Sequence, residues 1–199
     1  MPNFFYSLIH SSNTCDINHI GDGIFVSNWF SSVTEKTIRD FEIKWVINLS
    51  EKQKSNSELQ LYQKLGIKYY HYPTSDKVEN LLATQTMFRR AETALNEISP
   101  SDPDNRCLIH CTGGRSRSCA FVIYYLMRKF KKSYDVVYKL VETARPSIKL
   151  GPGVQKLLYD YESAKVSEIA TFGRETKKKN TKKSRNDTNS DKLAELLDR

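Results

Sequence analysis

The sequence has no long apolar run and few cysteines. No uninterrupted apolar stretch in its 199 residues approaches the length that crosses a bilayer, so no transmembrane segment is expected. The four cysteines have neither zinc-ligand spacing nor the density of a secreted disulfide scaffold. The first residues lack the charged flank and apolar core of a secretory signal. These absences indicate a reducing compartment, the cytosol or the nucleus, and no bound metal or other cofactor.

Alternating strand and helix patterns predict an α/β domain. Hydrophobic residues make up 39% of the chain, enough for one packed core. This alternation is typical of a central, mainly parallel, twisted sheet flanked by helices. The strand-like segments are 23–27, 44–49, 67–72 and 106–110, and the helical ones between them are 33–41, 58–65 and 84–98.

Composition divides the chain into three regions. We expect an N-terminal extension at 1–17, a folded domain at 18–163 and a basic, disordered tail at 164–199. The tail carries ten Lys or Arg and six Asp or Glu, hence +4 of the total +8. Its dense part, 177–185, suits an acidic partner, an anionic surface or nuclear import, or is simply solvated. No aromatic residues interrupt the basic ones, so binding of nucleic acid by base stacking is not expected.

One run between a strand pattern and an apolar helix pattern carries most of the chemical information. It reads His110-Cys111-Thr112-Gly113-Gly114-Arg115-Ser116-Arg117-Ser118. In a strand–loop–helix arrangement, successive backbone N–H groups converge on one concavity and the positive end of the helix faces it. Such a cradle holds a dianion, so the run predicts a site for phosphoryl transfer.

Two side chains of this run have chemistry that suits such a site. The converging dipoles favour ionisation of Cys111, whose thiolate can attack phosphorus and carry the phosphoryl group. Arg117 is spaced to reach over the cradle and grip two phosphate oxygens with its planar fork. Taken singly, Cys111 could be a small buried hydrophobic residue and Arg117 a surface charge. Their spacing within one loop between a strand and a helix favours a catalytic role for both.

The other residues of the run are expected to support these two. Ser118 can donate a hydrogen bond to the cysteine sulfur and help it leave, while His110 orders the loop by hydrogen bonding to backbone rather than acting as a base. The two glycines permit the backbone angles and close approach that a phosphate cradle requires. The predicted phosphate-binding residues are Thr112, Gly113, Gly114, Arg115 and Ser116.

The run resembles the Cys-x5-Arg-Ser/Thr signature of the protein tyrosine phosphatase superfamily, and more narrowly the dual-specificity phosphatases. The similarity continues through Ala144-Arg145-Pro146 and the closing segment 153–162, and spans roughly residues 18–162. It implies a protein tyrosine phosphatase-like fold and hydrolysis of phosphotyrosine and phosphoserine or phosphothreonine on proteins. The chain departs from many relatives at Gly151-Pro152, where they carry Pro-Asn.

Three aspartates preceding the run are candidates for the general acid that protonates the leaving oxygen. Sites in open α/β sheets form beyond the carboxyl ends of the strands. Asp102 and Asp104 precede the strand that feeds Cys111, whereas Asp76 follows the preceding strand and lies 111 − 76 = 35 residues upstream, close to the interval in similar phosphatases. We therefore select Asp76, against the alternative of an ordinary solvated aspartate.

The sequence leaves the substrate and the role of two cysteines open. Arg115 adds a second positive charge, which suits a doubly phosphorylated peptide or a phosphoinositide, or merely faces solvent. Two further alternatives are an RNA 5′-phosphatase of this superfamily, against which Gly113 and Ser118-Cys119 count because such enzymes usually carry His and Thr-Gly there, and a catalytically silent phosphate-binding module, against which Cys111 counts. Cys107 and Cys119 are expected to be buried packing residues, with a protective disulfide to Cys111 as the alternative.

Overall fold

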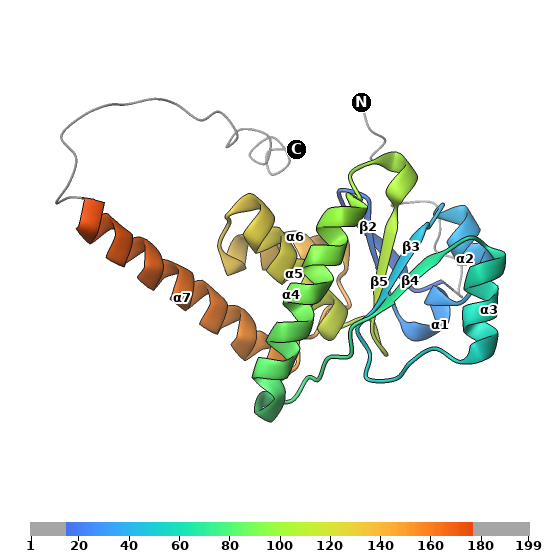
Figure 1. The fold of residues 1–199 in the computed structure, drawn as a ribbon, viewed down its shortest axis with the longest axis horizontal. Helices are drawn as coiled ribbons and strands as arrows, with labels where there is room; N and C mark the ends of the chain where they lie inside the picture. Colours follow the sequence, from blue (N-terminus) through green and yellow to red (C-terminus); the bar gives the residue numbers. More distant parts are fainter. Residues whose placement is uncertain (1–14, 177–199) are drawn as a thin grey trace.

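The computed structural model describes residues 15–176, with 165–176 as backbone alone, and contains a five-stranded sheet. The spatial order is β1-β2-β5-β3-β4 (Figure 1). Strand β1 runs antiparallel to β2 and the other neighbours are parallel, which confirms the predicted α/β class with a mainly parallel sheet. The strands are β1 (Ile17–Gly21), β2 (Ile24–Ser27), β3 (Trp45–Asn48), β4 (Lys68–His71) and β5 (Cys107–His110).

Helices cover both faces of this sheet (Figure 1). One face carries α1 (Trp29–Ser32), α2 (Glu35–Asp40) and α3 (Asn56–Lys64). The other carries α4 (Leu81–Ile98), α5 (Arg117–Phe130), α6 (Tyr134–Ala144) and α7 (Pro152–Thr176). Two short 3-10 helices, η2 (Val78–Asn80) and η3 (Pro103–Asn105), lie before α4 and β5.

Alternation along the strands produces one hydrophobic cluster on each face. Phe25, Val46 and Leu108 belong to the smaller cluster with α2 and α3, whereas Val26 and Ile109 belong to the larger one with α4 to α7. Successive side chains of a strand point to opposite faces, so a strand covered on both sides is apolar throughout. The central strand β5 is buried at every position.

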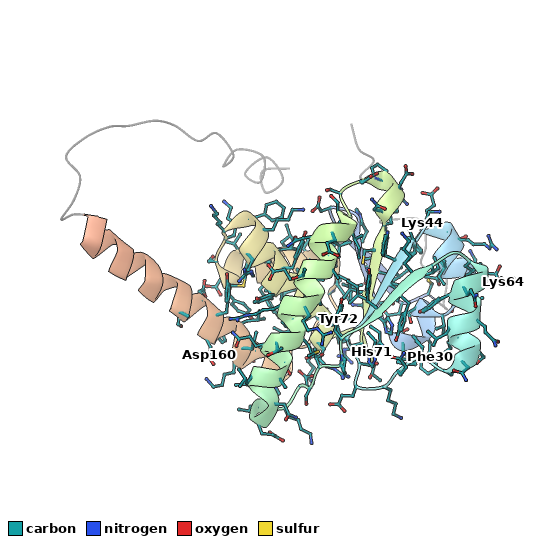
Figure 2. The ribbon with its side chains drawn as sticks, in the orientation of Figure 1. Phe30, Lys44, Lys64, His71, Tyr72 and Asp160 are labelled. Carbon is teal, nitrogen blue, oxygen red and sulfur yellow. The ribbon has the colours of Figure 1, made fainter. Side chains whose placement is uncertain are left out.

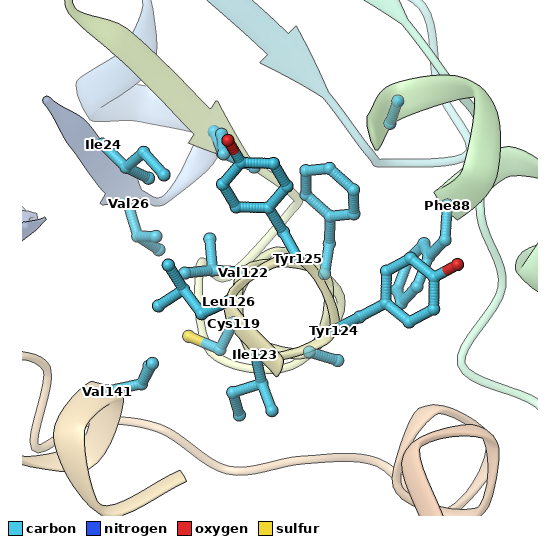
Figure 3. Packing of buried hydrophobic residues seen from close by; sticks show 14 of the residues in the cluster. Ile24, Val26, Phe88, Cys119, Val122, Ile123, Tyr124, Tyr125, Leu126 and Val141 are labelled. Carbon is cyan, nitrogen blue, oxygen red and sulfur yellow. The ribbon is translucent and has the colours of Figure 1, made fainter. Parts of the chain in front are cut away.

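Helix α5 is the centre of the larger cluster. All residues from 118 to 127 are buried, as predicted for a helix that is apolar nearly all round. Figure 3 looks along this helix, with Val26 of β2, Phe88 of α4 and Val141 of α6 arranged around it. The burial holds the first turn of α5, and therefore the loop before it, in one position.

The predicted strands agree with the structure to within one residue at each end, but three other features differ. Strand β1 and the short helix α1 were not predicted, whereas the helix expected at 33–41 is present as α2 (Glu35–Asp40). Helix α4 begins at Leu81 rather than at residue 84. The antiparallel edge strand has only five residues and reverses at a turn where Asp22 adopts φ 54°, a local geometry without a strong sequence pattern.

The folded unit extends beyond the predicted domain, residues 18–163, at both ends. Asp16 and β1 contact the rest of the domain at one end, and α7 continues to Thr176 at the other. The sequence predicted a disordered tail from residue 164, whereas the backbone of 164–176 continues α7, because adding residues to an existing helix is far less costly than starting one. Residues 1–14 and the basic run 177–185 lie outside the described residues. None of the helices within 15–176 is both long and apolar enough to cross a membrane.

Candidate active site

Residues 111–116, here the Cys111 loop, connect the centre of the sheet to α5. His110, the last residue of β5, is paired with Ser27 of β2 and Asn48 of β3. Helix α5 begins directly after the loop, at Arg117. The loop therefore lies at the carboxyl edge of the parallel strands, with the positive end of a buried helix directed at it. This is the predicted strand–loop–helix arrangement.

The Cys111 thiol is buried and hydrogen-bonded. Its side chain is 2% exposed, and Sγ lies 3.4 Å from the hydroxyl oxygen of Ser118. Burial by itself raises the pKa of this thiol, but hydrogen bonds from the Ser118 hydroxyl and backbone, followed by the Arg117 charge, outweigh it and lower the pKa below the ordinary 9.0. A thiol in such surroundings is a nucleophile in its ionised form.

His110 is fully buried beside this thiol. Its Nδ1 lies 3.1 Å from the carbonyl oxygen of Cys111, so the ring donates to the backbone, and its Nε2 has no hydrogen-bond partner among the described residues. Burial and then the charge of Lys54 lower the pKa of His110 to about 3. The imidazole is therefore neutral at physiological pH, and its contact is with the loop backbone, where the sequence predicted it.

The Arg117 guanidinium spans the opening of the Cys111 loop. One terminal nitrogen donates to the carbonyl oxygen of Thr74 at 3.2 Å, and the other donates to the Thr112 hydroxyl at 3.0 Å. Thr74 follows β4, so the fork joins the β4 side of the site to the start of the loop. A planar fork in this position can bind two oxygens of a dianion.

The two glycines of the loop differ in what they require. Gly114 has φ +64°, and a Cβ there would lie 2.3 Å from the carbonyl oxygen of Ser27. A Cβ on Gly113 would meet only the Arg115 side chain, at an ordinary 3.9 Å. Glycine is therefore needed at Gly114, where the loop packs on β2. At Gly113 neither a positive φ nor a protein neighbour requires glycine, and close approach to a phosphate there stays a prediction.

Arg115 is exposed and anchored away from the sulfur. Its Nε donates to the carbonyl oxygen of Ser147 at 3.0 Å, and its own carbonyl oxygen accepts from the backbone N–H of Lys149 at 2.9 Å. The segment after α6 thus supports the outer side of the Cys111 loop.

Arg145 is a supporting residue whose role the sequence did not predict. It is fully buried, and its Nε donates to the carbonyl oxygen of Gly114 at 2.6 Å. Its other nitrogens bind the carboxylate of Asp16 at 2.9 Å and the side-chain oxygen of Asn18 at 2.6 Å. A buried guanidinium therefore ties the loop to the chain entering β1. The sequence marked Arg145 only through the Ala-Arg-Pro resemblance.

Asp76 lies against the Cys111 loop. Its Oδ1 accepts a hydrogen bond from the Ser116 hydroxyl at 2.9 Å, and that hydroxyl accepts from the backbone N–H of Gly151 at 2.7 Å. A Cβ on Gly151 would lie 2.5 Å from the Asp76 carboxyl carbon. The departure at Gly151 thus leaves room for this carboxylate, a consequence that appears only in three dimensions.

Asp102 and Asp104 lie at the other edge of the sheet. Both are exposed in or beside η3, before β5 begins, and the Asp102 carboxylate caps that turn by accepting from the backbone N–H of Asp104 at 3.0 Å. Of the three candidates for the general acid, Asp76 is the one that contacts the Cys111 loop.

A second buried cation supports the opposite side of the loop. The backbone N–H of Trp29 donates to the carbonyl oxygen of Thr112 at 3.0 Å. The ammonium of Lys54 lies 3.5 Å from the centre of the Trp29 ring and donates to Ser32 at 2.9 Å. Glu58 accepts from the indole nitrogen at 2.9 Å. No pattern in the sequence distinguished Lys54 from the surface lysines around it.

The remaining cysteines pack in the core. Cys107 and Cys119 are both completely buried, as expected, and burial raises the pKa of the Cys119 thiol to about 12. Both are free thiols, so a disulfide to Cys111 stays a prediction. Within residues 15–176 no group of three or more His, Cys, Asp or Glu side chains is arranged to hold a metal ion.

Comparison with known families gives one domain match. The family described as "Dual specificity phosphatase, catalytic domain" matches residues 24–164. The Caenorhabditis elegans protein named tyrosine-protein phosphatase vhp-1 is 27% identical over 164 residues, which cover 79% of this chain and 24% of that protein. Human dual specificity phosphatase 28 is 41% identical over 58 residues, 29% of this chain and 33% of that one. The chain spans about a quarter to a third of the length of these curated relatives.

Solved structures show the same fold. The crystal structure of human DUSP28 covers 77% of this chain, with 97% of its own length aligned, at a TM-score of 0.59 and 23% identity. That of DUSP15 covers 85% of this chain and 100% of its own, at 0.64 and 18%. At such identities the likeness concerns the fold alone, whereas the family match spans strands β2 to β5, the Cys111 loop and Asp76. The chain therefore belongs to the dual specificity phosphatase catalytic domain family.

Proposed function

We propose that this chain hydrolyses phosphate monoesters through a cysteinyl-phosphate intermediate, and that its substrates are phosphoproteins carrying phosphotyrosine and phosphoserine or phosphothreonine. The observation that carries the proposal is the Cys111 thiol, whose pKa is lowered within a loop that opens at the carboxyl edge of the sheet. Membership of the dual specificity phosphatase family supports the choice of substrate class.

In the first step the Cys111 thiolate attacks phosphorus, so that an S–P bond forms as the P–O bond to the substrate breaks. Asp76 donates a proton to the departing oxygen. Arg117 binds two of the phosphoryl oxygens and stabilises the charge that they carry in the transition state. Its present partners, Thr74 and Thr112, hold the guanidinium across the opening, ready for this exchange.

In the second step water attacks the phosphoryl group and the S–P bond breaks. The Asp76 carboxylate takes the proton from water, inorganic phosphate leaves, and the thiolate is restored. Ser118, 3.4 Å from the sulfur, donates a hydrogen bond that makes the thiolate a better leaving group.

The other loop residues bind the phosphoryl group or hold the loop in shape. In this mechanism the backbone N–H groups of residues 112–116 donate to the phosphoryl oxygens, and Arg115 supplies a second positive charge at the outer side of the loop. His110 positions the carbonyl of Cys111 and takes no proton, since the pKa of its imidazole is about 3.

Hydrolysis of an aryl phosphate in the presence of a chelator tests the reaction itself. We expect turnover by the wild-type chain, and Cys111→Ser should bind substrate without hydrolysing it. Alkylation of the thiol by iodoacetamide should follow a pKa below that of an ordinary cysteine. Retained hydrolysis in Cys111→Ser, or turnover that requires added metal, would contradict the cysteine mechanism.

Substitution of the aspartate tests the general acid. Asp76→Asn should slow release of a poor leaving group by about 100-fold and that of an activated aryl group far less. Asp104→Asn is the matched control, because this carboxylate is exposed at the opposite edge of the sheet. Equal slowing of good and poor leaving groups would assign Asp76 a structural role instead.

A substrate panel separates phosphoproteins from the lipid and RNA substrates of the same superfamily. Phosphopeptides should be turned over with a higher kcat/KM than phosphoinositides and 5′-triphosphorylated RNA. Phosphoinositide turnover above that of every phosphopeptide would assign the site to lipids, and binding without turnover of any ester would assign it to a phosphate-binding module.

The chemistry of the Cys111 thiolate also bears on the cellular location of the protein. We propose a cytosolic or nuclear location, because a nucleophilic thiolate needs a reducing environment and all four cysteines are free. We also propose that the basic run 177–185 binds an acidic partner or an anionic surface. Salt-sensitive binding to an acidic peptide that is lost when 177–199 is removed would support the latter.

A further inference from the structure

Three apolar side chains are exposed at the edge of the sheet where the Cys111 loop opens. Phe30 is 78% exposed, Leu82 is 77% exposed and Val78 is 45% exposed. They belong to the two segments that follow β2 and β4. Figure 2 shows Phe30 at the same end of the sheet as His71, the last residue of β4, and opposite Lys44, which precedes β3.

Phe30 is joined directly to one side of the Cys111 loop. The preceding residue, Trp29, donates its backbone N–H to Thr112 at 3.0 Å, and its ring is held inward by Lys54. The following residues, Ser31 and Ser32, are buried. Helix α1 is therefore fixed on both sides of Phe30 while the phenyl ring itself faces solvent.

Val78 and Leu82 are joined to the other side of the Cys111 loop through neighbouring residues that bind it. Asp76, two residues before Val78, accepts a hydrogen bond from Ser116 at 2.9 Å, and its carbonyl oxygen accepts from the backbone N–H of Gly153 at 3.0 Å. Leu82 follows in the first turn of α4, which Thr84 anchors by its contacts with Ser75. Both apolar segments are thus held rigidly on either side of the same loop.

We propose that Phe30 on one side, and Val78 with Leu82 on the other, form a substrate-binding rim for an extended phosphopeptide with large apolar side chains on both sides of the phosphorylated residue. The proposal rests on the proposed function, since a phosphate in the cradle forces the flanking residues of its peptide to pass over these segments. Each flanking side chain would then bury apolar surface that is otherwise exposed to water.

Charge at the rim favours a peptide over a membrane surface. Lys77 and Glu79 are both exposed on either side of Val78, and Glu51 and Lys52 are both exposed just beyond β3, so the rim has no excess of basic residues at these positions. Surfaces that insert into anionic bilayers combine apolar residues with basic ones, and carboxylates beside the apolar residues oppose this binding. A peptide needs only apolar contact at these positions.

The test uses two phosphotyrosine peptides that are identical except for the residues flanking the phosphotyrosine, Leu on both sides in one and Ser in the other. With Cys111→Ser as the trapping background, the Leu peptide should bind about tenfold more tightly. Phe30→Ser and Leu82→Ser should each reduce this ratio by about threefold to fivefold. Phe130→Ser is the matched control, because Phe130 is 36% exposed at the far end of α5, about 20 Å from the loop.

The same rim variants, made with Cys111 intact, should hydrolyse a small aryl phosphate at the wild-type rate, because that substrate does not reach the rim. Equal affinity for the two peptides on the trapping background would overturn the proposal. A second result would also overturn it. In that result the protein sediments with phosphatidylinositol phosphate vesicles, sedimentation is lost in Phe30→Ser and Leu82→Ser, and the ratio of affinities for the Leu and Ser peptides is the same in these variants as in the wild type. Absence of aryl phosphate hydrolysis in the wild-type chain would instead contradict the proposed function, and the peptide affinities would still test the rim.

Discussion

Two buried cations support the Cys111 loop from opposite sides, and they are stabilised in different ways. Arg145 and Lys54 each have a side chain with no exposed surface and an acidic partner on a neighbouring element. Arg145 contacts the loop directly through the carbonyl oxygen of Gly114. Lys54 acts through Trp29, whose backbone N–H binds Thr112.

The two cations differ in how many hydrogen bonds their nitrogen atoms donate. The Arg145 guanidinium binds four oxygen-bearing groups, those of Gly114, Val26, Asn18 and Asp16. The Lys54 ammonium donates to two oxygens, the Ser32 hydroxyl at 2.9 Å and the Trp29 carbonyl at 3.4 Å, and it also contacts a ring face and a carboxylate at 3.7 Å. Burial consequently lowers the pKa of Lys54 to about 8, with Glu58 opposing the shift. A fork with many fixed donors can be buried with its charge, whereas an ammonium with few partners is close to losing it.

The largest expected effect is that of removing the fully bonded cation. Arg145→Met leaves the Gly114 carbonyl, Asn18 and the Asp16 carboxylate without their partner, so the free energy of unfolding should fall by about 3–5 kcal/mol. Hydrolysis of an aryl phosphate should fall with it, because the loop loses its support at Gly114. Urea unfolding and kcat measure the two effects.

Arg145→Lys is the control for charge alone. It restores one positive charge but not the fork, and should recover only part of the lost stability. Full recovery would show that charge rather than geometry matters at this position, and the contrast with Lys54 would disappear.

Removing the poorly bonded cation should have a smaller effect that depends on pH. At pH 7, Lys54→Met should change the free energy of unfolding by only about 1 kcal/mol, because a buried charge and its attractive contacts are lost together. Between pH 8 and 10.5 the unfolded wild-type chain keeps the Lys54 proton while the folded chain has released it. The wild type should therefore gain stability relative to Lys54→Met as pH rises through this window.

Chemical unfolding of both chains at several pH values measures this difference. If the free energies of unfolding of wild type and Lys54→Met differ by a constant amount from pH 7 to 10.5, the pKa of Lys54 is ordinary. The contrast between a well-satisfied Arg145 and a poorly satisfied Lys54 would then be wrong.

The smallest effects should come from neutralising the acidic partners. Asp16→Asn and Glu58→Gln should each lower the free energy of unfolding by about 0.5 kcal/mol, since both carboxylates are partly exposed. Glu58→Gln should also lower the pH at which the wild-type lysine begins to gain stability over Lys54→Met, because Glu58 raises the pKa of Lys54. Asp16→Asn should leave that pH unchanged, and a shift in both variants would indicate a general loosening of the loop.

Local patterns were sufficient for strands β2 to β5 and for the Cys111 loop. Strand positions followed from apolar runs between turn residues, and the loop followed from a nine-residue run whose spacing has few other uses. The choice of Asp76 over Asp102 and Asp104 needed only the order of strands and the rule that sites form at their carboxyl ends. The structure places Asp76 against Ser116.

The supporting residues could not be predicted in this way. Arg145 and Lys54 are charged residues in a chain with 31 basic ones, and nothing local indicates which of them are buried. The same holds for Gly151, whose missing side chain leaves room for Asp76. Each depends on a neighbour that is remote in the chain.

The sequence by itself determined the positions of strands β2 to β5 and the chemistry of the Cys111 loop, because hydrophobic periodicity and a short motif act over a few residues. Only the tertiary structure decided which cations support that loop, which glycine must remain a glycine and which apolar side chains stay exposed beside it. These features arise where segments far apart in the chain come into contact. The energy of a buried charge or of a close backbone approach depends on the neighbouring groups in that contact rather than on the residue type alone.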